Sequence, residues 1–296
     1  MDRPVRVVVA SATGRVGSRV CRLLDDAGVC WTGWTRRPDA AAAAAQAAGF
    51  VPQHGRWEAV DPEQADRVQP SLQGAAALLL ATHDHPAQDA IEAALIRACV
   101  AASVGHVVKL SAQSAGLSPP VSFGRLHARA EQALHDSGLS WTVLRPVFFM
   151  QSLLYFAGPV RRGTLPAPTG RGRVAFVDVE DVAAAAAAAL IDPATHAGRT
   201  YVLTGRESHA FADVAAGIAM RAGRAVRHRS PPGWLARLAL PLATGMPRWQ
   251  ATLVVELMQA IARDAQAETW PDLRQVIGRE ARGLEIFLDA QAAAFR

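Results

Sequence analysis

The sequence predicts an α/β fold with a doubly wound parallel sheet, followed by a smaller, mostly helical part. Short apolar runs alternate with helical patterns through the first two thirds of the 296 residues. Apolar strands joined by helical crossovers form a parallel sheet that is covered on both faces. The pattern changes after Leu144, where proline and glycine interrupt it and most later segments have helical spacing.

Each element is predicted from its local pattern. Strands are expected at residues 5–10, 29–35, 50–53, 76–81, 106–110, 141–144 and 201–203. Helices are expected at residues 16–27, 39–48, 62–72, 88–103, 123–136 and 178–190. Two of these helices are rich in alanine, the best helix former, which favours crossover helices over low-complexity segments. Ligands of such sheets bind at the carboxyl ends of the strands, so the residues that follow each strand are the site candidates.

The turn after the first predicted strand is typical of a phosphate-binding turn. Gly14 lets the backbone approach a phosphate, and Gly17 lets the following helix pack on the strand. The first glycine of the relaxed G-x-x-G-x-x-G spacing is replaced by Ser11, which still offers an N–H and a hydroxyl if its φ need not be positive. The alternative is an ordinary strand–turn–helix with incidental glycines. The residues expected to hold a dinucleotide pyrophosphate are Ser11, Thr13, Gly14, Arg15, Val16 and Gly17.

The end of the second predicted strand indicates which dinucleotide binds. Folds that bind NAD usually place a carboxylate there, which holds the ribose 2′-hydroxyl. This chain has Arg36 and Arg37 instead. A guanidinium matches a phosphate with two hydrogen bonds, so we expect a 2′-phosphate and therefore NADP(H), with Arg36 as the main contact and Arg15 assisting. The alternative is that one or both arginines are merely solvated.

Two regions are expected from this organisation. Residues 1–146, with 174–204 returning to them, are expected to form a Rossmann-type NADP-binding domain. Residues 147–173 and 205–296 are expected to form a smaller, substrate-covering region, with one short strand at 225–228. The residues of this region that fall near helical spacing are Trp249, Leu253, Leu257 and Ile261. We expect this face to pack in the core, and a homodimer contact is the alternative.

The composition argues against several classes of partner. The net charge of +5 comes from scattered arginines without a basic block, so nucleic acid is not expected as a partner. No apolar run reaches the ~18 residues that span a bilayer, and the chain enters a strand at once, so we expect no membrane association and a cytoplasmic location. The three cysteines have no metal-ligand spacing, which indicates buried thiols and no metal site.

Several segments together resemble a known family, the NmrA-like group of atypical short-chain dehydrogenases. The similar segments are 11–17 with Arg36, 107–111, 127–131, 137–146, 148–150, 176–183 and 201–205. The resemblance covers nearly the whole chain and is weakest beyond about residue 230. It implies a Rossmann fold and a nucleotide cofactor. The family includes NADPH-dependent quinone reductases, relatives of isoflavone reductase, and regulators that bind the nucleotide without turning it over.

The chain departs from that family at the third strand, which commonly ends in a Gly-Asp pair that helps to seat the adenine. Here Gly55 is followed by Arg56 and Trp57. Trp57 stacking on the adenine, with Arg56 as a cationic edge, is one interpretation. A loop that simply differs is the other.

The chain also lacks the usual acid. Short-chain dehydrogenases place Tyr-x-x-x-Lys on one helix, and the corresponding residues here are Phe123 and His127. Phenylalanine donates no proton, so His127 is our first catalytic candidate, as a hydrogen-bonding partner of the ribose or as a proton relay. Glu131, one turn further on, is expected to orient it. The alternative is a histidine that packs in the helix without a chemical role.

Other candidates follow the predicted strands. Ser111 is expected beside the nicotinamide, with an ordinary bond to the backbone as the alternative, whereas Lys109 is expected to be a structural lysine that reaches the sheet edge. Thr82 and His83 are expected to line the nicotinamide side, with His83 or His85 as a proton donor. Pro146 and Phe148 follow the sixth strand and are expected to contact the nicotinamide or wall the pocket, with core packing as the alternative for Phe148.

These observations predict an NADPH-dependent reductase of a small, apolar conjugated carbonyl or quinone-like compound. Such acceptors take a hydride with little acid assistance, which suits a site without tyrosine. The alternative is a non-catalytic protein that senses NADP(H). No nucleophile elbow and no Walker-type loop occur in the sequence.

Overall fold

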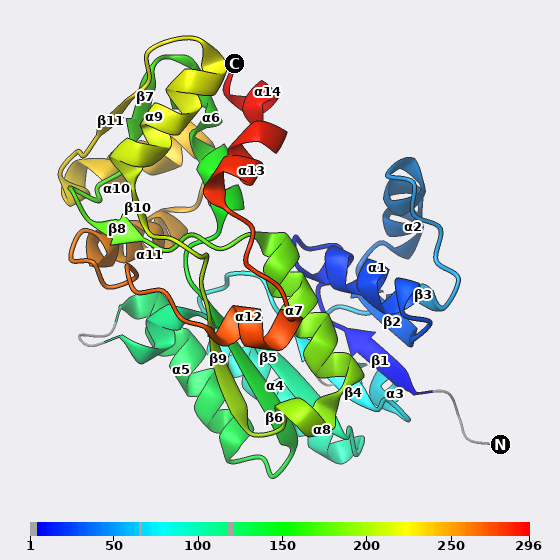
Figure 1. The fold of residues 1–296 in the computed structure, drawn as a ribbon. Helices are drawn as coiled ribbons and strands as arrows, with labels where there is room; N and C mark the ends of the chain where they lie inside the picture. The colour runs from blue at the N-terminus through cyan, green and yellow to red at the C-terminus, as the bar shows by residue number, and fades with distance from the viewer. Residues whose placement is uncertain (1–4, 65–66, 118–120) are drawn as a thin grey trace. The chain divides into compact units, whose positions relative to one another are not determined.

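The computed structural model describes residues 5–64, 67–117 and 121–296, which form two compact units (Figure 1). The first unit comprises Met1–Ala112, Leu126–Arg145 and Val182–Tyr201. The second comprises Gln113–Arg125, Pro146–Asp181 and Val202–Arg296. No helix among the described residues is both long and apolar enough to cross a membrane.

The first unit is built on a seven-stranded sheet with the order β3-β2-β1-β4-β5-β6-β9. Neighbouring strands from β3 to β6 pair in parallel. The strands are β1 (Arg6–Val9), β2 (Cys30–Thr35), β3 (Gly55–Ala59), β4 (Ala77–Leu80), β5 (His106–Leu110), β6 (Ser140–Pro146) and β9 (Arg199–Leu203). The order reverses between β1 and β4, and this reversal is where doubly wound sheets bind their ligands.

Helices cover both faces of this sheet (Figure 1). They are α1 (Gly17–Asp26), α2 (Pro38–Ala47), α3 (Gln69–Leu72), α4 (Gln88–Ala101), α5 (Ser122–His135), α7 (Val179–Ile191) and α8 (Pro193–His196). The three valines of β1 are fully buried, as expected for a strand that is covered on both sides. Apolar residues of β1, β4 and β5 pack with those of α4 in one cluster.

The second unit is mostly helical, as the sequence predicts. It contains 3₁₀ helices at Gln113–Gly116 and Met150–Phe156, a parallel pair of β7 (Thr164–Pro166) with β11 (Arg227–Arg229), and an antiparallel pair of β8 (Arg173–Val174) with β10 (His209–Ala210). Its helices are α6 (Ala157–Arg161), α9 (Phe211–Ala222), α10 (Gly233–Thr244), α11 (Arg248–Ile261), α12 (Asp272–Ile277), α13 (Leu284–Ala290) and α14 (Ala292–Phe295). Its core centres on the rings of Phe148, Phe176 and Phe211.

The third strand was predicted in the wrong place. It lies at Gly55–Ala59 rather than at residues 50–53. The segment predicted as a strand is held differently: the Phe50 ring stacks on Trp31, and the N–H groups of Gln53 and His54 donate to the Asp25 carboxylate at 3.0 and 2.8 Å. A carboxylate that accepts these N–H groups replaces the ladder of a strand.

Two helical predictions also need correction. Within residues 62–72 only Gln69–Leu72 is α-helical among the described residues, and residues 65–66 lie outside them. On α11 the buried positions are Ala251, Val255, Met258, Ala260 and Ile261. Of the predicted face, Ile261 is fully buried and Leu257 is partly buried and packs against the core, so core packing is confirmed for these two residues. Residues spaced by four drift around a helix of 3.6 residues per turn, which explains why the whole face is not buried. The homodimer contact stays a prediction.

Candidate functional site

The turn between β1 and α1 is compact, and its glycines are required by close contacts. A Cβ on Gly17 would lie 2.3 Å from the Ser11 carbonyl oxygen, and one on Gly14 would lie 3.0 Å from it. The Gly14 N–H donates to the same oxygen at 2.8 Å. Thr13 and Arg15 are exposed, whereas Val16 and Gly17 are buried. A surface turn without side chains at these points, placed before a helix N-terminus, fits a pyrophosphate.

Ser11 has a φ of +52°, so the condition that its φ need not be positive is not met. A serine there carries the strain that the usual glycine avoids. The turn therefore has the left-handed backbone conformation typical of glycine at a position occupied by serine.

Ser11→Gly is therefore expected to raise the free energy of unfolding by about 1 kcal/mol, since relief of a left-handed side chain exceeds the added freedom of the unfolded chain. Urea denaturation of the two proteins measures this difference. Ser11→Val is the opposite control and should destabilise, because a β-branched residue is most strained at positive φ. Equal stabilities of all three proteins would contradict a strained turn.

Two exposed arginines follow β2, which ends at Thr35. The Arg37 N–H donates to the Thr35 hydroxyl at 3.2 Å. Neither the Arg36 nor the Arg37 guanidinium has a hydrogen-bond or ion-pair partner among the described residues. β2 is the neighbour of β1 in the sheet, so these cations follow the strand next to the glycine turn.

Stacking of Trp57 on the adenine would require this residue to follow the third strand, and it does not. It lies within β3, and its ring packs edge-on against Trp31 at 5.0 Å between centroids. Arg56 pairs with Glu58 at 3.7 Å. The polar residue that does follow β3 is Asp61, which accepts the Glu63 N–H at 3.1 Å. Asp61 was not a candidate of the sequence analysis, because this strand has a mixed sequence and was predicted at residues 50–53.

A buried polar cluster, which we call the lysine cluster, joins β5 to α4 and α5. It consists of Lys109, Glu92, His127 and Thr82. The Lys109 and Glu92 side chains are completely buried, with Nζ 3.0 Å from Oε1 and 2.9 Å from Oε2. Nζ also lies 3.2 Å from Nδ1 of His127, and the Thr82 hydroxyl donates to Glu92 at 2.7 Å. Lys109 therefore does not reach the sheet edge, and it joins two of the predicted site residues.

Burial and the neighbouring Lys109 ammonium hold the pKa of His127 well below the usual value of histidine. The ring is consequently neutral at physiological pH. A neutral histidine supplies a hydrogen bond more readily than a proton.

A second buried cluster lies at the carboxyl ends of β5 and β6. The Ser111 hydroxyl donates to the Glu131 carboxylate, and Arg145 binds that carboxylate with two nitrogens, one of them at 3.0 Å. Ser111 and Glu131 are both nearly inaccessible. The hydrogen of Ser111 is therefore committed to Glu131, whose carboxylate was expected to orient His127.

The histidines after β4 lie in a different environment. The His83 side chain is 60% exposed and its Nε2 lies 3.0 Å from the Glu63 carboxylate. Nδ1 of His85 accepts the Ala87 N–H at 3.0 Å. No group of three potential metal ligands occurs among the described residues. The structure thus separates His83 from the lysine cluster, although Thr82 next to it is a member.

The remaining candidates belong to the second unit. Pro146 ends β6 and is buried. Phe148 is 8% exposed and packs edge-on against Phe176 and Phe211, which is the core-packing alternative. Phe149 is the more exposed of the two rings.

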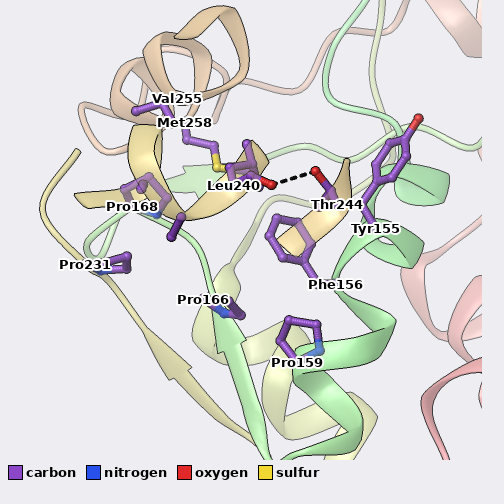
Figure 2. Close-up of a pocket in the computed structure, with 12 residues that line it drawn as sticks. Tyr155, Phe156, Pro159, Pro166, Pro168, Pro231, Leu240, Thr244, Val255 and Met258 are labelled. Carbon is purple, nitrogen blue, oxygen red and sulfur yellow. Dashed lines mark hydrogen bonds between the residues drawn. The ribbon is translucent and has the colours of Figure 1, made fainter. Parts of the chain in front are cut away.

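The second unit also holds an apolar pocket of about 80 Å³ (Figure 2). Its walls are Tyr155, Phe156, Pro159, Pro166, Pro168, Pro231, Ala236, Ala239, Leu240, Thr244, Val255 and Met258. None of these described wall residues is charged. The Thr244 hydroxyl donates to the Leu240 carbonyl at 2.7 Å, and the Tyr155 hydroxyl points away from the other walls (Figure 2). Four prolines give the pocket a rigid wall, so it is formed before any ligand enters.

Known proteins of similar sequence and structure agree with this architecture. A family profile described as NAD(P)H-binding matches residues 11–193. The chain is 34% identical over 290 residues to an NAD(P)H azoreductase of Xenophilus azovorans, which covers 98% of this chain and 99% of that protein. It is 32% identical over 294 residues to a (4-alkanoyl-5-oxo-2,5-dihydrofuran-3-yl)methyl phosphate reductase of Streptomyces griseus, with 98% and 99% coverage.

Solved structures show the same fold. The NADPH-dependent quinone oxidoreductase of Escherichia coli, complexed with NADPH, aligns with a TM-score of 0.83 at 23% identity over 96% of this chain and 99% of that one. The Citrobacter triphenylmethane reductase complexed with NADP(H) aligns with a TM-score of 0.81 at 22% identity, with 96% and 99% coverage. The chain belongs to the NAD(P)H-binding, NmrA-like family of atypical short-chain dehydrogenases, and it is an NAD(P)H-dependent oxidoreductase of that family.

Proposed function

We propose that the protein uses NADPH to reduce neutral, electron-poor conjugated compounds, quinone-like compounds or unsaturated carbonyls, that carry a hydrocarbon substituent. One observation supports this proposal: the hydroxyl and ammonium hydrogens of the candidate site already bind acceptors within the protein. Ser111 donates to Glu131, and Lys109 is buried among its acceptors. An acceptor that takes a hydride without prior protonation suits such a site.

The chain's own residues supply binding and orientation, while the bound nicotinamide supplies the hydride. The glycine turn, with Ser11, Thr13, Gly14, Arg15, Val16 and Gly17, holds the pyrophosphate. Arg36 and Arg37 hold the 2′-phosphate. On the nicotinamide side the proposed contacts are Thr82, Ser111 and His127.

The names of the relatives support a conjugated, electron-poor acceptor. An azo bond, a quinone and the unsaturated lactone of an oxo-dihydrofuran are all conjugated and electron-poor. The dihydrofuran also carries an alkanoyl chain. The apolar pocket has no charged side chain among the wall residues that the structure describes, so it suits such a chain better than a sulfonate or a phosphate.

The test is NADPH oxidation, followed by nicotinamide absorbance, with a panel of neutral quinones, enones and azo compounds and with sulfonated azo dyes. Turnover of neutral members above background, with weaker turnover of sulfonated ones, is expected. A protein that binds NADPH and oxidises it with no member of the panel would contradict the proposal.

Ser111→Ala is expected to lower kcat by less than about tenfold, whereas loss of a general acid costs about 100-fold or more. The reason is that Ser111 donates to Glu131 and has no second hydrogen for a substrate. Steady-state kinetics with the best quinone measures it. A 100-fold loss in kcat at unchanged KM would show instead that the hydroxyl turns towards the reacting carbonyl.

A further inference from the structure

Lys109 is the only lysine among the 31 lysine and arginine residues of the chain. Its side chain is fully buried on β5. The other 30 of these residues are arginines, so a lysine at this position indicates a need that a guanidinium does not meet. An ammonium is a compact charge with three tetrahedral hydrogens, whereas a guanidinium is a planar fork.

The surroundings of the ammonium match those three hydrogens one for one. Nζ donates to Oε1 of Glu92 at 3.0 Å and to the carbonyl of Leu110 at 2.6 Å, and it lies 3.2 Å from Nδ1 of His127. An ammonium donates only and accepts nothing, so all three neighbours accept. Nδ1 of His127 therefore carries no hydrogen, and the hydrogen of the neutral ring lies on Nε2.

The charged groups that the structure describes beside His127 offset one another without a charge on its ring. On β5 and α4 the Lys109 ammonium is offset by Glu92, which Thr82 and Gln88 also hold. On α5, one turn beyond His127, Glu131 is offset by Arg145 from β6. A protonated imidazole would place a second cation in contact with the ammonium, inside the fold. Burial and that ammonium accordingly hold the pKa of His127 well below its ordinary value.

We infer that Lys109 and Glu92 are positioning residues for His127: they fix its ring as a permanent Nε2–H hydrogen-bond donor, so that His127 does not act as a proton relay. The sequence analysis left open whether His127 is a hydrogen-bonding partner of the ribose or a proton relay. The inference rests on the proposed function only in taking His127 as a residue of the reductase site. The state of the ring is a property of the protein without any substrate.

NMR spectroscopy of the full chain tests the inference directly. Lysine labelled at Nζ gives a single side-chain signal, because the chain has one lysine, and labelled histidine reports the rings, with His127 assigned by its loss in His127→Gln. In the wild-type protein we expect the His127 hydrogen on Nε2 and no titration from about pH 5 to about pH 8, with and without NADPH. A hydrogen on Nδ1, or protonation within that range, would overturn the inference.

Two matched variants separate positioning from general stability. Lys109→Met removes the donor and leaves the Glu92 carboxylate as the nearest charge, so the pKa of His127 should rise and the ring should titrate. Lys109→Met/Glu92→Gln removes both charges, and the ring should stay neutral but occupy both tautomers. The pH profile of kcat should gain an ionisation in the single variant alone.

An unchanged ring state in Lys109→Met would contradict the inference. If that variant does not fold, the wild-type spectra still decide it. Expected spectra together with no turnover of any acceptor would leave the positioning role intact and refute the proposed function instead.

Discussion

Replacing Arg36 and Arg37 together with glutamine is expected to raise the Kd for NADPH about 100-fold and to leave the Kd for NADH nearly unchanged. Two lost charge-assisted hydrogen bonds cost about 1.5 kcal/mol each, and about 1.4 kcal/mol is a factor of ten in affinity. Both side chains are exposed after β2, so the substitutions should not disturb the core. Calorimetric titration with both nucleotides, at one ionic strength, measures the change.

The matched control is Arg97→Gln/Arg199→Gln, which removes the same net charge from two other exposed arginines of the first unit. The control should change the Kd for NADPH and the Kd for NADH only by the small effect of the protein's net charge. Equal losses for NADPH and NADH in the Arg36/Arg37 variant would show that the pair does not bind a 2′-phosphate. Arg36→Gln alone is expected to cause the larger share, since Arg36 is the first residue after the strand.

The strands and the glycine turn could be predicted because their signals are local. The apolar runs of β1, β4 and β5 are buried on both faces and read directly as strands. The third strand, Gly55–Ala59, could not be predicted, because it mixes polar and apolar residues and is only partly buried. The segment 50–53 begins with apolar residues but is not a strand, and Gln53 and His54 at its end donate their N–H groups to Asp25, about 28 positions earlier.

The members of the candidate site could be named from the sequence, but their pairing could not. Thr82, Ser111 and His127 were all candidates, yet the groups that control them lie on other elements: Glu92 on α4 and Arg145 on β6. Pairs between different elements of this kind cannot be recognised from the spacing of residues in the sequence. The one available signal was a lone lysine inside an apolar strand, which requires a buried carboxylate somewhere in the fold.

The apolar pocket of the second unit leads to a predicted change in KM that is similar in size to the change in Kd predicted for the arginine pair. In a series of quinones that differ only in the length of one alkyl chain, KM is expected to fall about fourfold per methylene, because each buried CH₂ contributes about 0.8 kcal/mol. The pocket of about 80 Å³ is roughly half of a cavity that binds benzene, so the gain should end after about three carbons, near 50-fold in total.

Ala236→Phe should abolish this dependence on chain length while turnover of the unsubstituted quinone is retained. Ala236 lines the pocket from α10 and is only partly buried, so a larger side chain fills the space without crowding the core. Leu238→Phe is the matched control, since Leu238 is on the same helix, 63% exposed and not part of the pocket wall. A chain-length dependence that survives in Ala236→Phe, or that is lost equally in Leu238→Phe, would place the hydrocarbon part of the substrate elsewhere.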